Sequence, residues 1–268
     1  MLNKKIMFVG GGLMAGGIIR AMALKQAINP SDMLVYEIVP ERMKKLEEDY
    51  GVTAVGSIAE GVAQADVVLL ALKPQIALSV AEEVKAHRKP GSFLFSICAG
   101  LTIETLSEAY GGDMPIVRTM PHGFSQVMQG VTGVCFGATC DDEVRQVSRS
   151  IIESFGSALE ISEGQMDIFT GFCAVGALWV MHMVLPLRYG ACEAGLTLEE
   201  AMDLALENLA GTVDLVKASG EHPRVVCDRI LEPGGPAVRA LNSLEKNGYY
   251  AAVVRNVKAG CDRATALS

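Results

Sequence analysis

A run of glycines near the start of the chain has the spacing of a phosphate-binding turn. The short apolar run within residues 4–9 predicts a buried strand, Gly10-Gly11-Gly12 follows it, and a helical pattern begins at once. The order Gly-x-Gly-x-x-Ala puts glycines where the chain must turn tightly and where its backbone must approach a ligand. Free N–H groups at the start of the next helix then favour negative charge. We therefore predict a pyrophosphate-binding turn, made of Gly10, Gly11, Gly12, Leu13, Met14 and Ala15.

A carboxylate at a fitting distance completes the fingerprint of a dinucleotide site. Met33–Glu37 predicts the second strand, and Glu37 falls at its end, 22 residues after Ala15. A spacing of about 20 residues is typical of the acid that binds the adenosine ribose. A carboxylate there accepts hydrogen bonds from both ribose hydroxyls of NAD and repels the 2′-phosphate of NADP. We predict NAD(H) as the favoured cofactor and keep NADP(H) as an alternative. The other interpretation of Glu37 is a solvated loop acid.

The composition excludes several classes of partner. The chain has 268 residues, a formal net charge of −8, and 50% hydrophobic residues. The negative charge argues against nucleic acid and against anionic membranes. Its seven cysteines form no C-x-x-C pair and no metal-ligand spacing with histidine. The first residues enter a strand directly, so we expect no secretory signal. These features predict a cytoplasmic protein with reduced thiols and no bound metal.

One nearly uncharged segment is long enough to cross a membrane. It runs from Phe169 to Leu187 and contains His182 and Pro186. Ordinary amphipathic helices follow it, and no basic flank marks a cytoplasmic side. A helix that is apolar all round also suits the centre of a helical domain or a subunit interface. We predict that use, and no membrane partner.

The order of elements predicts an α/β domain followed by a helical one. Predicted strands cover 4–9, 33–37, 52–55, 67–72, 92–97, 115–119, 131–136 and 157–161. Predicted helices between them include 12–26, 40–50, 75–87, 102–110 and 141–154. Such alternation is typical of a Rossmann-like, doubly wound, mostly parallel sheet with helices on both faces.

Strand patterns stop after Ile161. The remaining patterns predict helices over 164–190, 198–219, 222–231, 236–247 and 249–266. We predict a dinucleotide-binding domain over 1–161 and an all-helical domain, for substrate binding and dimerisation, over 162–268. A helical domain of this size with a wholly apolar helix leaves apolar area exposed, so a homodimer or a higher oligomer is expected.

Motifs along the whole chain resemble one enzyme family. They are Lys73-Pro74-Gln75, Ser96–Leu101, Arg118-Thr119-Met120-Pro121 and Pro233-Gly234-Gly235, joined by Glu163, Asp167 and Thr170 and by the ending Leu244–Val253. In their order and spacing they resemble pyrroline-5-carboxylate reductase, which reduces a cyclic imine to proline. The resemblance covers about residues 4–267.

The resemblance implies where the nicotinamide ring would bind. In that family the ring lies over the carboxyl ends of the strands, which is where open α/β sheets bind ligands. Carried over to this chain, the resemblance assigns the cofactor pocket to Leu72, Lys73, Pro74, Ala99, Gly100, Met120 and Pro121.

The segments expected to bind the substrate depart from the family pattern. The family's Met-Pro-Asn-Thr-Pro is here Met120–Phe124, its Ser-Gly-Ser-Gly-Pro-Ala-Tyr is Cys173–Trp179, and its Pro-Gly-Gly-Thr-Thr is Pro233–Ala237. Hydroxyls and N–H groups that hold the imino acid's carboxylate in the family are thereby lost. The resemblance places the substrate among Phe124, Val175, Gly176, Trp179, Gly235, Pro236 and Ala237, which make a more apolar pocket.

Hydride transfer to a protonated imine needs positioning more than side-chain chemistry. The candidate catalytic groups are His122, which titrates near neutral pH, and Glu232, which could pair with an iminium nitrogen. His182 is interpreted as an interior histidine. The alternatives are another cyclic imine or secondary amine as substrate, or a dinucleotide-binding regulator without catalysis. A β-hydroxyacid dehydrogenase would need a lysine in the first long helix after residue 161, and the chain has none between Lys89 and Lys217.

Overall fold

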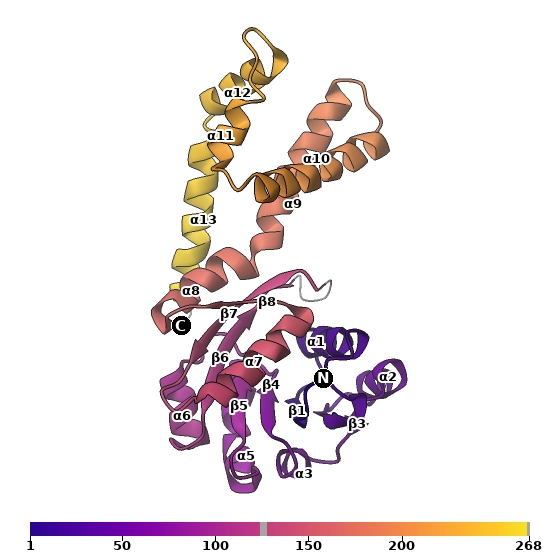
Figure 1. The fold of residues 1–268 in the computed structure, drawn as a ribbon, viewed down its shortest axis with the longest axis vertical. Helices are drawn as coiled ribbons and strands as arrows, with labels where there is room; N and C mark the ends of the chain where they lie inside the picture. Colours follow the sequence, from indigo (N-terminus) through magenta and orange to yellow (C-terminus); the bar gives the residue numbers. More distant parts are fainter. Residues whose placement is uncertain (124–127, 267–268) are drawn as a thin grey trace. The chain divides into compact units, whose positions relative to one another are not determined.

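The computed structural model describes residues 1–123 and 128–266, which form two compact units. The first unit contains Met1–Val175 together with the chain from Cys261 onward, and the second contains Gly176–Gly260. Figure 1 shows the elements of both units.

An eight-stranded sheet forms the centre of the first unit, with the strand order β3-β2-β1-β4-β5-β6-β7-β8. The strands are β1 (Ile6–Val9), β2 (Met33–Tyr36), β3 (Thr53–Ala54), β4 (Val67–Leu70), β5 (Phe93–Ser96), β6 (Ile116–Pro121), β7 (Gly130–Phe136) and β8 (Gly156–Glu160). All neighbours are parallel except β6 and β7, which pair antiparallel. The reversal of direction in strand order around β1 and β4 is that of a doubly wound sheet, so the predicted fold class is confirmed.

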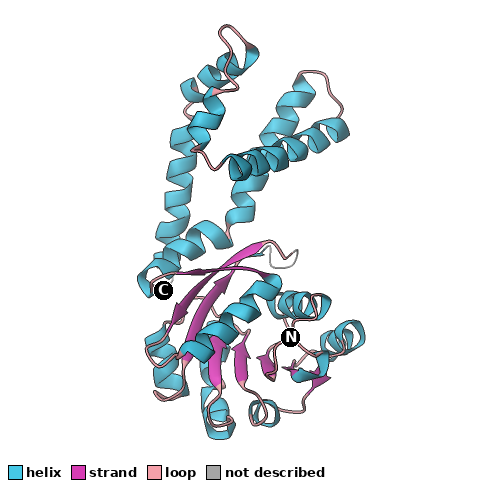
Figure 2. Ribbon diagram, viewed as in Figure 1, coloured by secondary structure: helices cyan, strands magenta, loops and turns pink. Residues whose placement is uncertain are grey.

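Helices cover both faces of this sheet (Figure 2), because alternate strand residues point to opposite sides. Ile6 and Phe8 belong to one buried cluster, whereas Met7 and Val9 belong to another. The first cluster includes residues of α1 (Leu13–Leu24), α2 (Pro40–Tyr50) and α7 (Asp142–Phe155). The second includes residues of α3 (Ile58–Val62), α4 (Pro74–Ser79), α5 (Ala81–His87) and α6 (Ile103–Tyr110).

One helix of this unit differs from its prediction, and another was not predicted. The helix expected over 75–87 is divided into α4 and α5 at Val80, which ends one helix and begins the next. Helix α3 was not predicted, although Ser57 and Glu60 carry its signal. The Ser57 hydroxyl accepts a hydrogen bond from the Glu60 N–H, as an N-cap does.

The long helix expected over 164–190 is also divided. It consists of the 3-10 turn η3 (Glu163–Gln165), α8 (Met166–Phe169), the π-helical η4 (Thr170–Ala174) and α9 (Gly176–Glu193). Met166 and Phe169 are buried against Met120 and Cys135 of the sheet. The first compact unit therefore continues to Val175, beyond the point near Ile161 where the strand patterns end.

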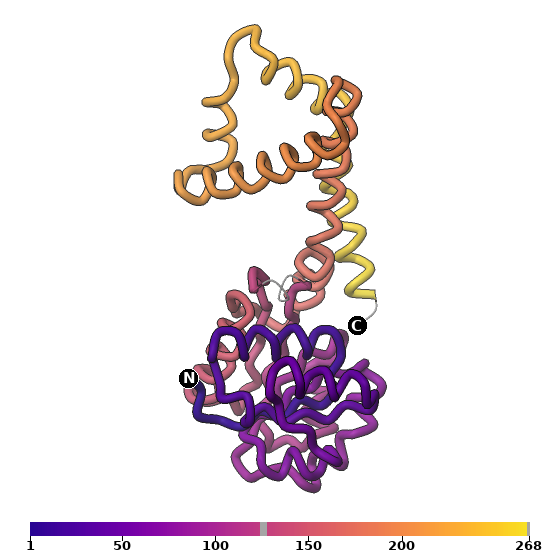
Figure 3. The backbone as a smooth tube through the Cα atoms, turned by 90° about the vertical axis from the view of Figure 1, so that its right-hand side faces the viewer, coloured from indigo at the N-terminus to yellow at the C-terminus, as the bar shows by residue number. Residues whose placement is uncertain are grey.

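The second unit contains α9, α10 (Leu198–Ser219), α11 (Pro223–Asp228), α12 (Pro236–Lys246) and the first residues of α13 (Tyr249–Thr265). Its path can be followed in Figure 3. Helix α10 begins with a capping box between Thr197 and Glu200 and ends at the left-handed Gly220. Within Gly176–Gly260, all of which is described, only four residues are buried, namely Val184, Ala201, Ala205 and Val226.

Candidate functional site

The glycine turn after β1 contains one position, Gly10, that only glycine fits. Gly10 has φ +100°, and a Cβ there would lie 2.7 Å from the Ala71 carbonyl oxygen and 2.9 Å from Cδ2 of Leu72. By contrast, a Cβ on Gly12 would meet no atom within 4 Å. At Gly10 the turn therefore packs tightly against the end of β4. At Gly12 the space beside the backbone is empty, which lets a ligand approach the backbone closely.

The start of α1 is suited to an anion. Gly12 is its N-cap and provides no side-chain hydrogen bond, and the first turn of this fully described helix carries no acidic residue. The first N–H groups of a helix lack intrahelical partners and lie at the positive end of its dipole. Phosphate groups are the ligands that such a terminus binds after a glycine-rich turn.

Glu37 is buried and holds the glycine turn. Only 5% of its side chain is exposed. Its Oε2 accepts hydrogen bonds from the Gly11 N–H at 2.9 Å and from Nη1 of Arg42 at 3.1 Å, and its Oε1 accepts one from the Val39 N–H at 3.0 Å. The interpretation of Glu37 as a solvated loop acid is therefore wrong. Since a carboxylate offers about four lone-pair positions, Oε1 retains acceptor capacity for one further donor.

A cavity of about 480 Å³ opens beside this turn. Its lining includes Gly11, Gly12, Leu13, Gly16, Gly17, Arg20, Arg42, Lys45, Leu46, Asp49 and Tyr50. Leu13 is 80% exposed despite its apolar side chain. A pocket with a phosphate-type turn, three cationic side chains and one aromatic ring fits the adenosine and phosphate end of a dinucleotide.

The segments predicted to contact the nicotinamide all leave neighbouring strands at one edge of the sheet. Leu72-Lys73-Pro74 follows β4, Ala99-Gly100 follows β5, and Met120-Pro121 ends β6. These three strands are consecutive in the sheet, and β4 also neighbours β1. Gly100 has φ +74°, whereas Met120 and Pro121 are buried. The structure therefore brings together the predicted cofactor residues of the first unit.

His122 follows directly after β6 and is 7% exposed. Burial lowers the pKa of its imidazole below the ordinary value, because the charged form loses its hydration. A neutral imidazole near neutral pH can accept a proton or donate a hydrogen bond. The prediction for Phe124 lies outside the described residues.

The predicted substrate residues of the second unit lie on two different elements. Trp179 of α9 lines a cavity of about 390 Å³ together with His182, and with Tyr249 and Asn256 of α13. The Trp179 indole nitrogen is buried and has no hydrogen-bond partner among the described residues. His182 is exposed, so its interpretation as an interior histidine is wrong. No site role was predicted for Asn256, or for Tyr249 within the family-like ending Leu244–Val253, because both meet α9 only through the packing of helices.

The turn before α12 carries the remaining candidates. Glu232 is exposed, and its carbonyl oxygen accepts a hydrogen bond from the Gly235 N–H at 3.0 Å. Gly235 is the N-cap of α12, and Pro236 and Ala237 begin the helix. Val175, in contrast, belongs to the first unit, where it is 37% exposed.

Two further features limit the chemistry. No group of three or more His, Cys, Asp or Glu side chains within the described residues could hold a metal ion.

By length and composition alone, one helical stretch, Glu163–Glu193, could cross a membrane. Its beginning packs on the sheet through Met166 and Phe169, and the core helix of a protein without membrane contact passes the same test.

Two family models match the chain, one for each end. The model described as pyrroline-5-carboxylate reductase dimerisation matches residues 163–267. The model described as NADP oxidoreductase coenzyme F420-dependent matches residues 5–100.

Similar proteins extend over the whole chain. Pyrroline-5-carboxylate reductase of Escherichia coli is 28% identical over 267 residues, which cover 100% of this chain and 99% of the relative. The solved structure of a pyrroline-5-carboxylate reductase from Coxiella burnetii has a TM-score of 0.93 and 26% identity, with 100% and 99% of the two chains covered. The Plasmodium falciparum enzyme, solved with NADP bound, has a TM-score of 0.88 and 29% identity over 100% and 99%.

Proposed function

The chain belongs to the pyrroline-5-carboxylate reductase family, and from this premise we propose that it reduces pyrroline-5-carboxylate, or a closely related cyclic imine, with a hydride from a nicotinamide dinucleotide. The protein is an NAD(P)-dependent oxidoreductase that acts on a carbon–nitrogen bond. The observation that carries the proposal is the glycine turn, in which Gly12 leaves open space at its Cβ position and begins α1 as an N-cap without a side-chain hydrogen bond.

The residues of the first unit have distinct tasks in this proposal. The N–H groups of Gly12 and Leu13 would hold the pyrophosphate, and the cavity beside α2 would take the adenosine. Pro74, Gly100 and Pro121 would border the nicotinamide with stiff or close backbone. The bound dinucleotide supplies the hydride equivalent. The chain's own contribution is to fix the imine carbon at short range and to exclude water, since a protonated imine is already electrophilic.

His122 is the proposed proton-bearing group near the reacting atoms, and Glu232 the proposed partner of the substrate nitrogen. Reduction adds a hydride to the carbon of an imine whose nitrogen is already protonated, which gives the neutral amine. A buried imidazole with a lowered pKa is neutral, so it would accept a hydrogen bond from the iminium N–H and orient it.

A different imine is the second candidate substrate, because donors expected for a carboxylate are absent from named positions. Val175 and Ala237 have no side-chain donor, and Pro236 also lacks an N–H. A buried carboxylate without donors costs several kcal/mol, which corresponds to orders of magnitude in affinity.

The assay that tests the proposal compares two substrates. We expect turnover of pyrroline-5-carboxylate with NADH or NADPH, followed by loss of dihydronicotinamide absorbance. The unsubstituted ring, 1-pyrroline, serves as the comparison. A higher kcat/KM for 1-pyrroline would favour the second candidate. Dinucleotide binding without turnover of either imine would instead support a regulatory protein and refute the proposed reaction.

We further propose NADH as the preferred coenzyme, since Glu37 puts a buried negative charge beside the ribose end of the cavity. The NADP-bound relative from Plasmodium shows that the family also accepts NADP, and Arg20, Arg42 and Lys45 provide positive charge here. Glu37→Ser should therefore raise kcat/KM for NADPH relative to NADH by about tenfold or more, a change of about 1.4 kcal/mol. Glu41→Ser, an exposed acid in the first turn of α2, is the matched control. Unchanged preference in both variants would contradict the assignment.

The dimerisation-family match supports homo-oligomerisation, and we propose at least a homodimer formed through the helical unit. We also propose a location in the reducing cytoplasm, which the seven free thiols support.

A further inference from the structure

Arg118 is a buried charge that the proposed reaction does not use. Among the described residues it is the only lysine or arginine that is buried, with 3% of the residue exposed. It lies in the interior of β6, opposite Ser96 of β5 and Cys135 of β7. Its Nε atom has no hydrogen-bond partner among the described residues. Replacement of a whole buried ion pair by apolar side chains of similar volume is often neutral or stabilising, so the presence of this arginine and its partner calls for another reason.

Glu163 is the partner of this arginine and joins a third element. Its Oε1 accepts hydrogen bonds from Nη1 of Arg118 at 2.9 Å and from the N–H of Ile103 at 2.7 Å. Ile103 is the first residue of α6, and Glu163 is the first residue of η3. Asp167 of α8 adds a second carboxylate, with its Oδ1 3.7 Å from Nη2 of Arg118. One carboxylate oxygen thus connects β6, α6 and the segment after β8.

The two connected elements lead into the segments expected to border the nicotinamide. Met120-Pro121 lies two residues beyond Arg118 on β6, and Ala99-Gly100 lies just before the start of α6. The Thr119 hydroxyl adds a hydrogen bond to the Ser96 carbonyl oxygen at 2.9 Å, which joins β6 to the end of β5. The relative position of both segments therefore depends on contacts centred at Glu163.

We infer that Arg118 and Glu163 are positioning residues, which fix the Met120-Pro121 and Ala99-Gly100 segments around the nicotinamide. The inference rests on the proposed function of this site. Hydride transfer is sensitive to such placement, since reacting atoms must approach to about 3–3.5 Å and a shift of about 1 Å lowers the rate about 100-fold. The role is geometric: the hydrogen bonds at Oε1 matter, and the negative charge does not.

Two substitutions at Glu163 separate geometry from charge. Glu163→Gln keeps an oxygen that can accept both hydrogen bonds, whereas Glu163→Ala removes it. We expect kcat to fall about 100-fold in Glu163→Ala and less than about threefold in Glu163→Gln. With coenzyme deuterated at the transferred position, the isotope effect on kcat should rise in Glu163→Ala, because hydride transfer becomes slower. Glu160→Ala is the control: Glu160 is exposed and accepts from two arginines, Arg145 and Arg149, on the same edge of the sheet.

A readout without turnover distinguishes this inference from the proposed reaction. The fluorescence lifetime of bound NADH reports on the surroundings of its dihydronicotinamide. It should change in Glu163→Ala and remain unchanged in Glu163→Gln and Glu160→Ala, while the dissociation constant of NADH stays within about threefold. Arg118→Met should also change the lifetime, and because it leaves the Glu163 carboxylate without its cationic partner, a lower melting temperature is expected as well. An unchanged lifetime in folded Glu163→Ala, or an equal loss in Glu163→Gln and Glu163→Ala, would overturn the positioning role. Absence of imine turnover in the unsubstituted protein would refute only the reaction.

Discussion

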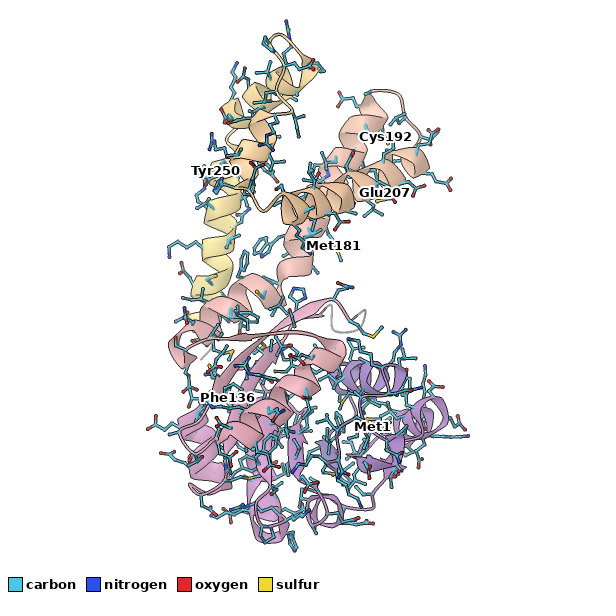
Figure 4. The ribbon with its side chains drawn as sticks, viewed as in Figure 1. Met1, Phe136, Met181, Cys192, Glu207 and Tyr250 are labelled. Carbon is cyan, nitrogen blue, oxygen red and sulfur yellow. The ribbon has the colours of Figure 1, made fainter. Side chains whose placement is uncertain are left out.

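The two compact units of the chain differ in how far they are complete by themselves. In the first unit, strands such as β1 and β4 are fully buried between two layers of helices. In the second unit, α12 and α13, both described in full, contain no buried residue. Large apolar side chains remain exposed there, among them Met181 at 58% and Tyr250 at 77%, which are labelled in Figure 4.

The first unit therefore folds around its own apolar core, whereas the second leaves apolar side chains exposed that a partner could bury. An apolar face of this extent on a soluble domain marks an interaction surface. The dinucleotide end of the reaction is therefore built from one chain, whereas the helical end takes its final form from a second copy in our proposal. Substitutions in the first unit should act on folding and coenzyme binding, and substitutions in the second should act on assembly.

The largest expected effect is a loss of stability and of coenzyme binding in the first unit, caused by adding one atom at Gly10. Gly10→Ala introduces a Cβ 2.7 Å from the Ala71 carbonyl oxygen at φ +100°. Positive φ and backbone overlap together should lower the free energy of unfolding by about 3 kcal/mol and abolish measurable NADH binding. The measurements are denaturant unfolding and fluorescence titration.

Gly91→Ala is the matched control for that experiment. Gly91 also has positive φ, at +78°, but a Cβ there would meet no atom within 4 Å. It should lose only about 1 kcal/mol, the conformational part of the effect. Equal losses in both variants would mean that the contact with β4 does not close the turn.

A smaller effect is expected on self-association through the exposed apolar residues of the second unit. Leu187 of α9 and Leu204 of α10 are 55% and 51% exposed. The double variant Leu187→Glu/Leu204→Glu should weaken self-association by about 100-fold or more, since two charges would be buried at the interface. Sedimentation velocity over a range of concentrations measures this. Leu24→Glu, at an equally exposed position (59%) of α1, should leave the mass unchanged. A monomeric unsubstituted protein at micromolar concentration would contradict the proposed dimer.

The smallest effect concerns pH and again belongs to the first unit. Burial lowers the pKa of His122 in the folded protein, so the unfolded chain binds its proton more readily. His122 therefore supports stability fully above about pH 6.5, the unfolded value, and this support is lost as pH falls from there through the lower folded pKa. Melting temperatures measured from pH 8 to pH 5 should fall less steeply for His122→Asn. Parallel curves for the two proteins would contradict the assignment.

The elements of the fold were largely predictable because their signals are local. The bounds of α2 and α10 agree with the sequence to the residue, since Pro40 begins one helix and Thr197 and Gly220 cap the other. The division of the segment after Glu163 was not predictable. It depends on Met166 and Phe169 reaching the sheet, and no local pattern reports a contact with a distant strand.

The candidate site divides in the same way. The glycine turn and Glu37 were found because a fixed spacing along the chain carries their chemistry. The hydrogen bonds from the Gly11 N–H to Glu37, and from the Ile103 N–H to Glu163, join residues that are 26 and 60 positions apart. Such pairs form only when the sheet has set its register, and Tyr249 comes beside Trp179 only when α9 and α13 pack together.

The length and capping of helix α10 bear on the order of folding and assembly. It is 22 residues long, with its own capping box at Thr197 and its own stop at Gly220. Isolated helices become marginally stable in water at about 12–15 residues, and capping adds to this. We therefore expect the segment to be at least partly helical before the proposed second copy binds. For the homodimer that we propose, the rate of recovery after denaturation should depend on the concentration of chains.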